Sequence, residues 1–104
     1  MFQIWVGCGR EGQILVWDSK TLEPKEGITL QCQGISKMLL LQGRVWAATK
    51  DGMIFVIDQV RHFNHRLLHA HNDTIRSICC AQTRYVLSGA GSLDGKIAMW
   101  KTNV

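Results

Sequence analysis

The strongest constraint on the fold is an internal repeat with a period of about 40 residues. Gly12, Gly52 and Gly95 are spaced by 40 and 43 residues, and each lies between two short apolar runs. The residue five positions after each of these glycines is large and apolar. A repeat of this length indicates supersecondary units that cannot bury their apolar faces alone and therefore stack on one another.

Each repeat predicts a β-hairpin with further strands on either side. The apolar runs are rich in β-branched and aromatic residues, and the turns between them contain glycine, which adopts positive φ readily. The predicted hairpins pair residues 3–8 with 13–17, 44–49 with 53–57, and 85–89 with 96–101; the predicted flanking strands are 28–32, 35–41, 66–69 and 74–81. We expect residues 18–27, which contain the only proline, to form an exposed loop, and essentially no helix.

The second strand of each hairpin is apolar on both faces. In the first hairpin, Ile14 and Val16 alternate with Leu15 and Trp17. A strand of this kind is typical of a sheet that is covered on both sides. The pattern and the ~40-residue period together predict the four-stranded blades of a propeller.

Composition and charge restrict the class of protein. The 104 residues suffice for one small domain, and 46% apolar with 19% charged residues is a globular composition. The net charge of +4 comes from scattered basic residues, so we expect no nucleic-acid partner. No apolar run is long enough to span a membrane, and no signal peptide is apparent. The four cysteines lack a Cys-x-x-Cys spacing, which favours reduced core cysteines in a cytoplasmic protein.

These residues resemble the WD-repeat β-propeller family. Residues 14–18, Ile-Leu-Val-Trp-Asp, match the tryptophan–aspartate ending that names the family, whereas residues 97–101 keep only the tryptophan and residues 54–58 only the aspartate. The resemblance covers nearly the whole chain. It implies an all-β fold, namely a partial WD-repeat-like propeller of about two and a half four-stranded antiparallel blades. The implied units are roughly 1–33 (partial), 34–70 and 71–104 (without its outer strand). Because propellers have ~4–8 blades, the chain is then the C-terminal portion of a longer protein.

The resemblance also implies a buried hydrogen-bonded set that stiffens each blade. In the last unit the set is His71, Ser88, Asp94 and Trp100, although the turn from Gly89 to Asp94 is longer than is usual in the family. A buried Trp N–H needs an acceptor, which a Ser–His–Asp chain can supply. The first unit retains Trp17 and the middle unit retains Asp51, so these two complete the predicted structural network.

Catalytic and metal-binding interpretations have less support. The histidines are clustered in sequence, at His62, His65, His69 and His71. Clustering can mark a metal site, but no carboxylate or cysteine accompanies them at ligand spacing, so we expect no metal and no cofactor. The residue types of a hydrolase triad are present, yet Ser88 lies on a predicted strand and not in a nucleophile elbow. Residues 7–12 form a Gly-x-Gly-x-x-Gly string that joins two strands and lacks the helix of a dinucleotide site. We predict no catalytic residue.

Binding of a partner has more support. If the blades run as predicted, Arg10, Lys50, Arg76 and Leu93 lie on one rim. Arginine and lysine there would suit acidic or phosphorylated peptides, or weak contact with an anionic membrane surface. Scattered surface charge that only keeps the domain soluble is the alternative.

The resulting functional hypothesis is a non-catalytic protein–protein interaction scaffold within a larger intracellular protein. The alternative is a regulatory tail of an enzyme whose catalytic part lies upstream. Propellers resembling this one terminate some DENN-domain exchange factors for Rab GTPases, some Rho exchange factors and some large kinases, and the DENN type is preferred here. A complete β-sandwich or barrel of 104 residues is the third possibility.

Overall fold

The computed structural model describes residues 3–8, 12–59 and 64–102, and strands dominate these ranges. The strands are β1 (Gln3–Cys8), β2 (Gln13–Asp18), β3 (Pro24–Thr29), β4 (Ile35–Leu41), β5 (Arg44–Thr49), β6 (Met53–Asp58), β7 (Asn64–His69), β8 (Ile75–Ala81), β9 (Tyr85–Ala90) and β10 (Ile97–Lys101). No helix occurs in the described part of the chain. The prediction of an all-β fold is therefore confirmed.

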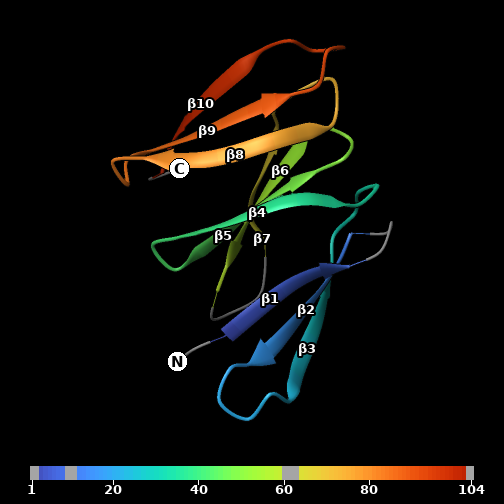
Figure 1. Ribbon diagram of the computed structural model, residues 1–104, viewed down its shortest axis with the longest axis vertical. Coiled ribbons are helices and arrows are strands. Elements are labelled where there is room, and N and C mark those ends of the chain that lie inside the picture. Colours follow the sequence, from blue (N-terminus) through green and yellow to red (C-terminus); the bar gives the residue numbers. More distant parts are fainter. Residues whose placement is uncertain (1–2, 9–11, 60–63, 103–104) are drawn as a thin grey trace.

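The strands form three antiparallel sheets that stack in chain order (Figure 1). Sheet 1 has the strand order β1-β2-β3, sheet 2 the order β4-β5-β6-β7, and sheet 3 the order β8-β9-β10. In Figure 1 they follow one another along the longest axis, from the blue sheet 1 through the green sheet 2 to the orange and red sheet 3. The described residues thus form an open stack whose two end sheets each have one uncovered face.

Two apolar cores join the sheets. The first, between sheets 1 and 2, includes Ile14, Val16 and Ile57, all with no exposed surface. The second, between sheets 2 and 3, includes Trp46 and Val86. Side chains alternate between the two faces of a strand, so β5 and β6 contribute to both cores. The prediction of a doubly buried second strand is confirmed for β6, where residues 54–57 are all buried.

Strand β3 corrects one sequence-based prediction. We expected residues 18–27 to form a loop and residues 28–32 to form the strand, but β3 runs from Pro24 to Thr29. The loop is shorter because the Asp18 carboxylate accepts hydrogen bonds from the backbone N–H groups of Lys20 and Thr21 and closes a tight turn. A proline is tolerated there because the strand lies at a sheet edge, where its missing N–H removes no ladder bond.

The repeat glycines occupy turns that need positive φ. Gly12, Gly52 and Gly95 have φ values of 71°, 85° and 67°. At Gly52 a Cβ atom would also collide with the backbone carbonyl oxygen of His71. The glycine therefore allows the β5–β6 turn to contact the segment that leads into β8, which brings two consecutive sheets together at one edge.

The cysteines correct a second prediction. Cys79 and Cys80 are free thiols, as expected, but both are exposed and neither belongs to a core. They pair with Leu87 and Val86 respectively, so they point to opposite faces of sheet 3, as predicted. Strand β8 lies at the edge of its three-stranded sheet, which leaves its side chains less covered than those of β5 or β6.

Candidate functional site: a buried polar chain and the rim above it

Sheet 3 contains a chain of hydrogen bonds that joins the four residues of the predicted set. His71 Nε2 lies 2.9 Å from Ser88 Oγ, and His71 Nδ1 lies 3.2 Å from Asp94 Oδ1. The Trp100 indole N–H donates to the same Ser88 Oγ over 3.3 Å. Strand β9 supplies the serine and strand β10 the tryptophan. The segment between β7 and β8 supplies the histidine, and the β9–β10 turn supplies the aspartate. The long turn before Asp94 does not keep Ser88 out of the set.

Asp94 is held by the backbone as well as by His71. Its carboxylate accepts hydrogen bonds from the N–H groups of Asn72, at 2.7 Å, and Lys96, at 2.9 Å. These bonds favour the ionised carboxylate, and the one from Asn72 contributes most to holding the pKa of Asp94 below its ordinary value. Asp94 thereby ties the β9–β10 turn to the segment that leads into β8.

Burial decides what this chain can do chemically. The side chains of His71 and Asp94 are 1% and 3% exposed, and Ser88 is 1% exposed. A nucleophilic serine must reach a substrate carbonyl, whereas Ser88 Oγ is shared between two protein groups and shielded from solvent. The arrangement therefore satisfies buried polar groups and offers no site for attack on an external substrate.

The two remaining members of the predicted network lie elsewhere. Trp17 sits half-buried on β2, opposite Ile4 in the sheet register, on the outer face of sheet 1. The Asp51 carboxylate accepts a long bond, 3.4 Å, from the backbone N–H of Gln33. This contact ties the β5–β6 turn to the segment that leads into β4. The structure thus places Trp17 and Asp51 outside the polar chain of sheet 3, because they belong to the other two sheets.

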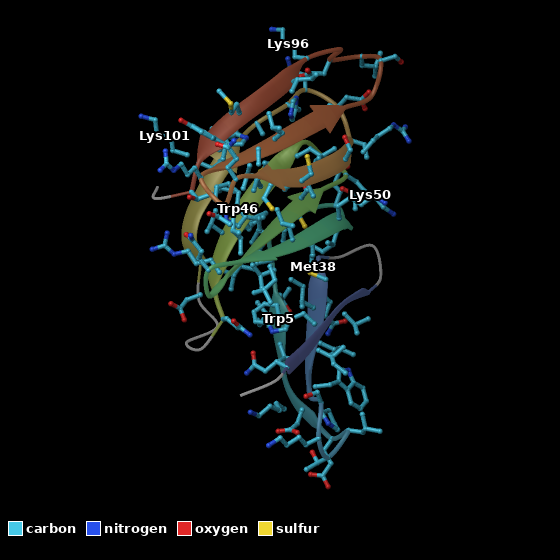
Figure 2. The ribbon with its side chains drawn as sticks, turned by 60° about the vertical axis from the view of Figure 1, so that its left-hand side comes forward. Trp5, Met38, Trp46, Lys50, Lys96 and Lys101 are labelled. Carbon is cyan, nitrogen blue, oxygen red and sulfur yellow. The ribbon has the colours of Figure 1, made fainter. Side chains whose placement is uncertain are left out.

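Three of the four predicted rim residues share one edge of the stack. Thr74 Oγ1 donates to the backbone carbonyl of Lys50 over 2.7 Å, which joins the β5–β6 turn to the β7–β8 segment. Lys50, Arg76 and Leu93 are all exposed, and Leu93 is 84% exposed. Figure 2 shows Lys50 on one side of the molecule and Lys101 on the opposite side. Arg10, the fourth predicted rim residue, lies outside the described residues.

Asp73 is the rim residue that sequence reasoning missed. Its carboxylate accepts hydrogen bonds from the N–H groups of Thr74, at 2.7 Å, and Leu93, at 3.2 Å. A Cβ atom added at Gly91 would meet both the Asp73 carboxylate and Arg76 Nε, so these side chains converge there. An acidic residue two positions after His71, directly before a Thr that begins a strand pattern, was the available signal. Asp73 therefore orders the β9–β10 turn of this rim.

The opposite edge carries a hollow of about 310 Å³ that the sequence did not indicate. It is lined by Arg84, Tyr85, Lys101 and Thr102. These residues are separated by up to eighteen positions and meet only because β9 pairs with β10, which sets Tyr85 opposite Lys101. The hollow supplies a second basic surface on the same sheet. A test of the predicted rim must therefore compare substitutions at the two surfaces.

The histidine cluster forms no recognisable metal centre in the described ranges. Within residues 3–8, 12–59 and 64–102, no three His, Cys, Asp or Glu side chains converge as metal ligands would. His62 and the side chain of His65 are not among the described groups. The described residues also contain no helix capable of crossing a lipid bilayer.

Comparisons with known proteins give one relative in sequence and two solved structures with a similar fold. No protein-family model matches the chain. It is 32% identical over 108 residues to a segment of DENN domain-containing protein 3 from Mus musculus, a match that covers 95% of this chain and 8% of that protein. The chain therefore spans less than a tenth of the length of this curated relative.

Two solved structures of computationally designed proteins, Ika8 and Ika4, each match with a TM-score of 0.80 over 95% of this chain. Their sequence identities are 22% and 21%, and the match covers 30% of Ika8 and 59% of Ika4. At such identities the likeness concerns the fold alone. This chain thus shares its stacked-sheet fold with longer solved chains, and in sequence it is similar to one segment of a much larger DENN domain-containing protein.

Proposed function

We propose that this chain is part of a WD-repeat-type propeller and serves as a non-catalytic scaffold for protein–protein contacts in an intracellular protein. The observation that carries the proposal is the buried His71–Ser88–Asp94–Trp100 chain. It fixes the β9–β10 turn against the segment that leads into β8, and ordered turns on a stiff scaffold are what a recognition surface requires. The successive stacked sheets are consistent with consecutive blades.

The contact surface in this proposal is the rim formed by Lys50, Arg76 and Leu93. Its two cations stand beside an exposed apolar side chain, and Asp73 holds the intervening turn in place. A cationic and apolar surface favours a peptide that combines carboxylate or phosphate groups with an apolar residue. The proposed partners are therefore acidic or phosphorylated protein segments, with weak anionic membrane contact as a lesser possibility.

Charge reversal on the two edges of the same sheet tests this surface. The change is Lys50→Glu with Arg76→Glu, and the matched control is Arg84→Glu with Lys101→Glu on the opposite edge. Binding of an array of acidic, phosphorylated and neutral peptides is measured by fluorescence anisotropy at low and high salt. We expect the first pair to reduce binding of acidic peptides at least tenfold, salt to weaken the wild-type interaction, and the control pair to leave most of it intact.

Two results would overturn the rim assignment. Equal binding of acidic and neutral peptides would remove its chemical basis. Loss of binding in the Arg84/Lys101 pair, with retention in the Lys50/Arg76 pair, would move the site to the hollow at the opposite edge. Both pairs change exposed side chains, so circular dichroism should remain that of the wild type.

A second candidate function is favoured by the match to DENN domain-containing protein 3. The chain would then be a regulatory segment of a DENN-type exchange factor whose catalytic part lies elsewhere in the longer protein. Release of a fluorescent nucleotide from Rab GTPases, measured with this chain added, separates catalysis from binding. We expect no acceleration, because in this proposal the exchange activity belongs to another part of the longer protein. Accelerated release would refute the non-catalytic assignment.

A further inference from the structure

Sheet 3 exposes an apolar face at one end of the stack. We call the face of a sheet that points toward the next sheet along the chain its leading face. In sheet 3 the leading face carries Leu87, Ile97 and Met99, because Val86 and Ser88 point the other way, into the core. Ile97 is 80% exposed and Met99 is 64% exposed. Exposed apolar side chains grouped in this way mark an interaction surface.

Sheet 1 exposes an apolar face at the other end. We call the face that points toward the preceding sheet the trailing face. In sheet 1 it carries Ile4 and Val6, each 43% exposed, because Trp5 and Gly7 pack toward sheet 2. Figure 2 places Trp5 and Met38 at the junction of these two sheets. Cross-strand pairing adds Trp17 opposite Ile4 and Leu15 opposite Val6 to the same face.

The internal repeat identifies what each leading-face residue is built to contact. The isoleucines two positions after the repeat glycines are Ile14, Ile54 and Ile97. Ile14 is buried between sheets 1 and 2, and Ile54 between sheets 2 and 3, each with no exposed surface. Their equivalent Ile97 is exposed because none of the described sheets lies against this face. The same holds four positions after each glycine, where Val16 and Val56 are buried and Met99 is not.

The trailing faces repeat in the same way. Five positions after the repeat glycines stand Trp17, Ile57 and Trp100, which pair with Ile4, Val45 and Val86. Ile57 belongs to the core between sheets 1 and 2, and Trp100 packs against the core between sheets 2 and 3. Among the residues that the structure describes, Trp17 packs against neither core. A leading face therefore meets a trailing face twice within this chain, and one unsatisfied copy of each face remains.

We propose that a second copy of this chain covers these faces, with the leading face of sheet 3 in one copy packed on the trailing face of sheet 1 in the other. The leading face has a hollow of about 300 Å³, whose lining includes Ser77, Cys79, Leu87, Gly89 and Ile97. Small residues at Ser77 and Gly89 leave room there for the bulky Trp17. The contact is head-to-tail and uses two different surfaces, unlike a two-fold symmetric interface.

Complementation between two half-blocked variants tests this contact. Ile97→Lys with Met99→Lys blocks the leading face, and Val6→Lys blocks the trailing face. Sedimentation velocity of the 104-residue chain over a range of concentrations should give association for the wild type and monomers for each variant alone. A mixture of the two variants should form one-to-one heterodimers, because each contributes its intact face. Leu22→Lys, a 66% exposed turn position on neither face, should associate like the wild type.

Three outcomes would overturn the proposal. A wild-type chain that stays monomeric at every concentration has no such contact. Self-association that persists in the Val6→Lys variant indicates pairing of two leading faces. Variants that lose association but do not complement one another indicate a surface other than the two named faces. Far-ultraviolet circular dichroism identifies any variant that has unfolded, and Ile97→Ser with Val6→Ser then serve as milder replacements at the same positions.

Discussion

Sheets 2 and 3 contain copies of the same sequence repeat but are stabilised in different ways. Sheet 2 is covered on both faces, and residues 45–48 of β5 are all buried apolar side chains. Sheet 3 is covered on one face and contains the polar chain between His71 and Trp100. At equivalent positions, sheet 2 has Ala47 where sheet 3 has Ser88, and Ile57 where it has Trp100.

The difference shows two kinds of stabilisation in consecutive sheets. Apolar burial is non-directional and grows with the area removed from water, and sheet 2 gains it on both faces. Sheet 3 buries apolar area on one face. Its β9–β10 turn is also fixed by directional bonds, such as those that Asp94 accepts from the backbone at Asn72 and Lys96. We expect the free energy of unfolding to fall most when buried apolar side chains are removed from sheet 2 and when hydrogen-bonding side chains are removed from sheet 3.

Removal of the largest buried side chain of sheet 2 should have the greatest effect. Trp46, at 1% exposure, reaches the core that joins sheets 2 and 3. Trp46→Ala should lower the free energy of unfolding by about 3–5 kcal/mol, as measured by urea titration at one fixed protein concentration. The same change at the half-buried Trp17 is the control and should cost clearly less. Equal losses of unfolding free energy at both positions would contradict the expectation that burial in the doubly covered sheet contributes more stability.

Loss of the shared acceptor in sheet 3 should come next. Ser88→Ala leaves the Trp100 N–H and His71 Nε2 buried without this partner, which should cost about 1–3 kcal/mol. Ser77→Ala, on the exposed face of the same sheet, should stay within about 0.5 kcal/mol of the wild type. In a double-mutant cycle with His71→Ala, a coupling of about 0.5–3 kcal/mol is expected for groups in one network. Additive effects would show that the chain of bonds does not act as a unit.

Insertion of the repeat tryptophan into sheet 2 tests whether the covered middle sheet can accept the residue that sheets 1 and 3 have. Ile57→Trp restores the residue found at positions 17 and 100, but Ile57 is fully buried between sheets 1 and 2. Overpacking should destabilise the chain by about 1–3 kcal/mol. Ile97→Trp, at an exposed position, should be nearly neutral. A stabilised Ile57→Trp variant, detected by a higher urea midpoint, would mean that the middle sheet lacks only its tryptophan.

The free energy of unfolding should depend on the ionisation of Asp94 only at acid pH, and this effect should be smaller than those of the three substitutions above. The pKa of Asp94 is lower in the folded chain than its ordinary value of 3.8, chiefly because the Asn72 N–H bonds to the carboxylate. The folded state therefore gains from the ionised form. This gain is present above the ordinary pKa and is lost as pH falls through the lowered folded value. Urea midpoints of wild type and Asp94→Asn should differ at pH 6 and converge toward pH 3; a constant difference would exclude this origin.

Much of the fold follows from local patterns. The apolar runs in residues 35–41 and 44–49 predict β4 and β5 with the bounds that the structure has, because glycine-containing turns limit the length of each run. The prediction was wrong at β3. The Asp18 carboxylate shortens the turn between β2 and β3 by accepting backbone hydrogen bonds, and a hydropathy pattern does not predict such bonds. The exposure of Cys79 was also missed, because strand composition does not reveal which sheet lies at the end of a stack.

The candidate sites divide along the same line. The sequence by itself determined the repeat, its strands and the residue types of the polar chain, since these depend on spacing along one strand or turn. Only the tertiary structure decided that Ser88 is inaccessible, that Asp73 joins Arg76 and Leu93 on one rim, and that Ile97 and Trp17 occupy opposite ends of the stack. The same apolar residue is a core residue when a sheet follows it and a binding surface when none does. Its role is therefore set by its neighbours in space, which the local sequence does not encode.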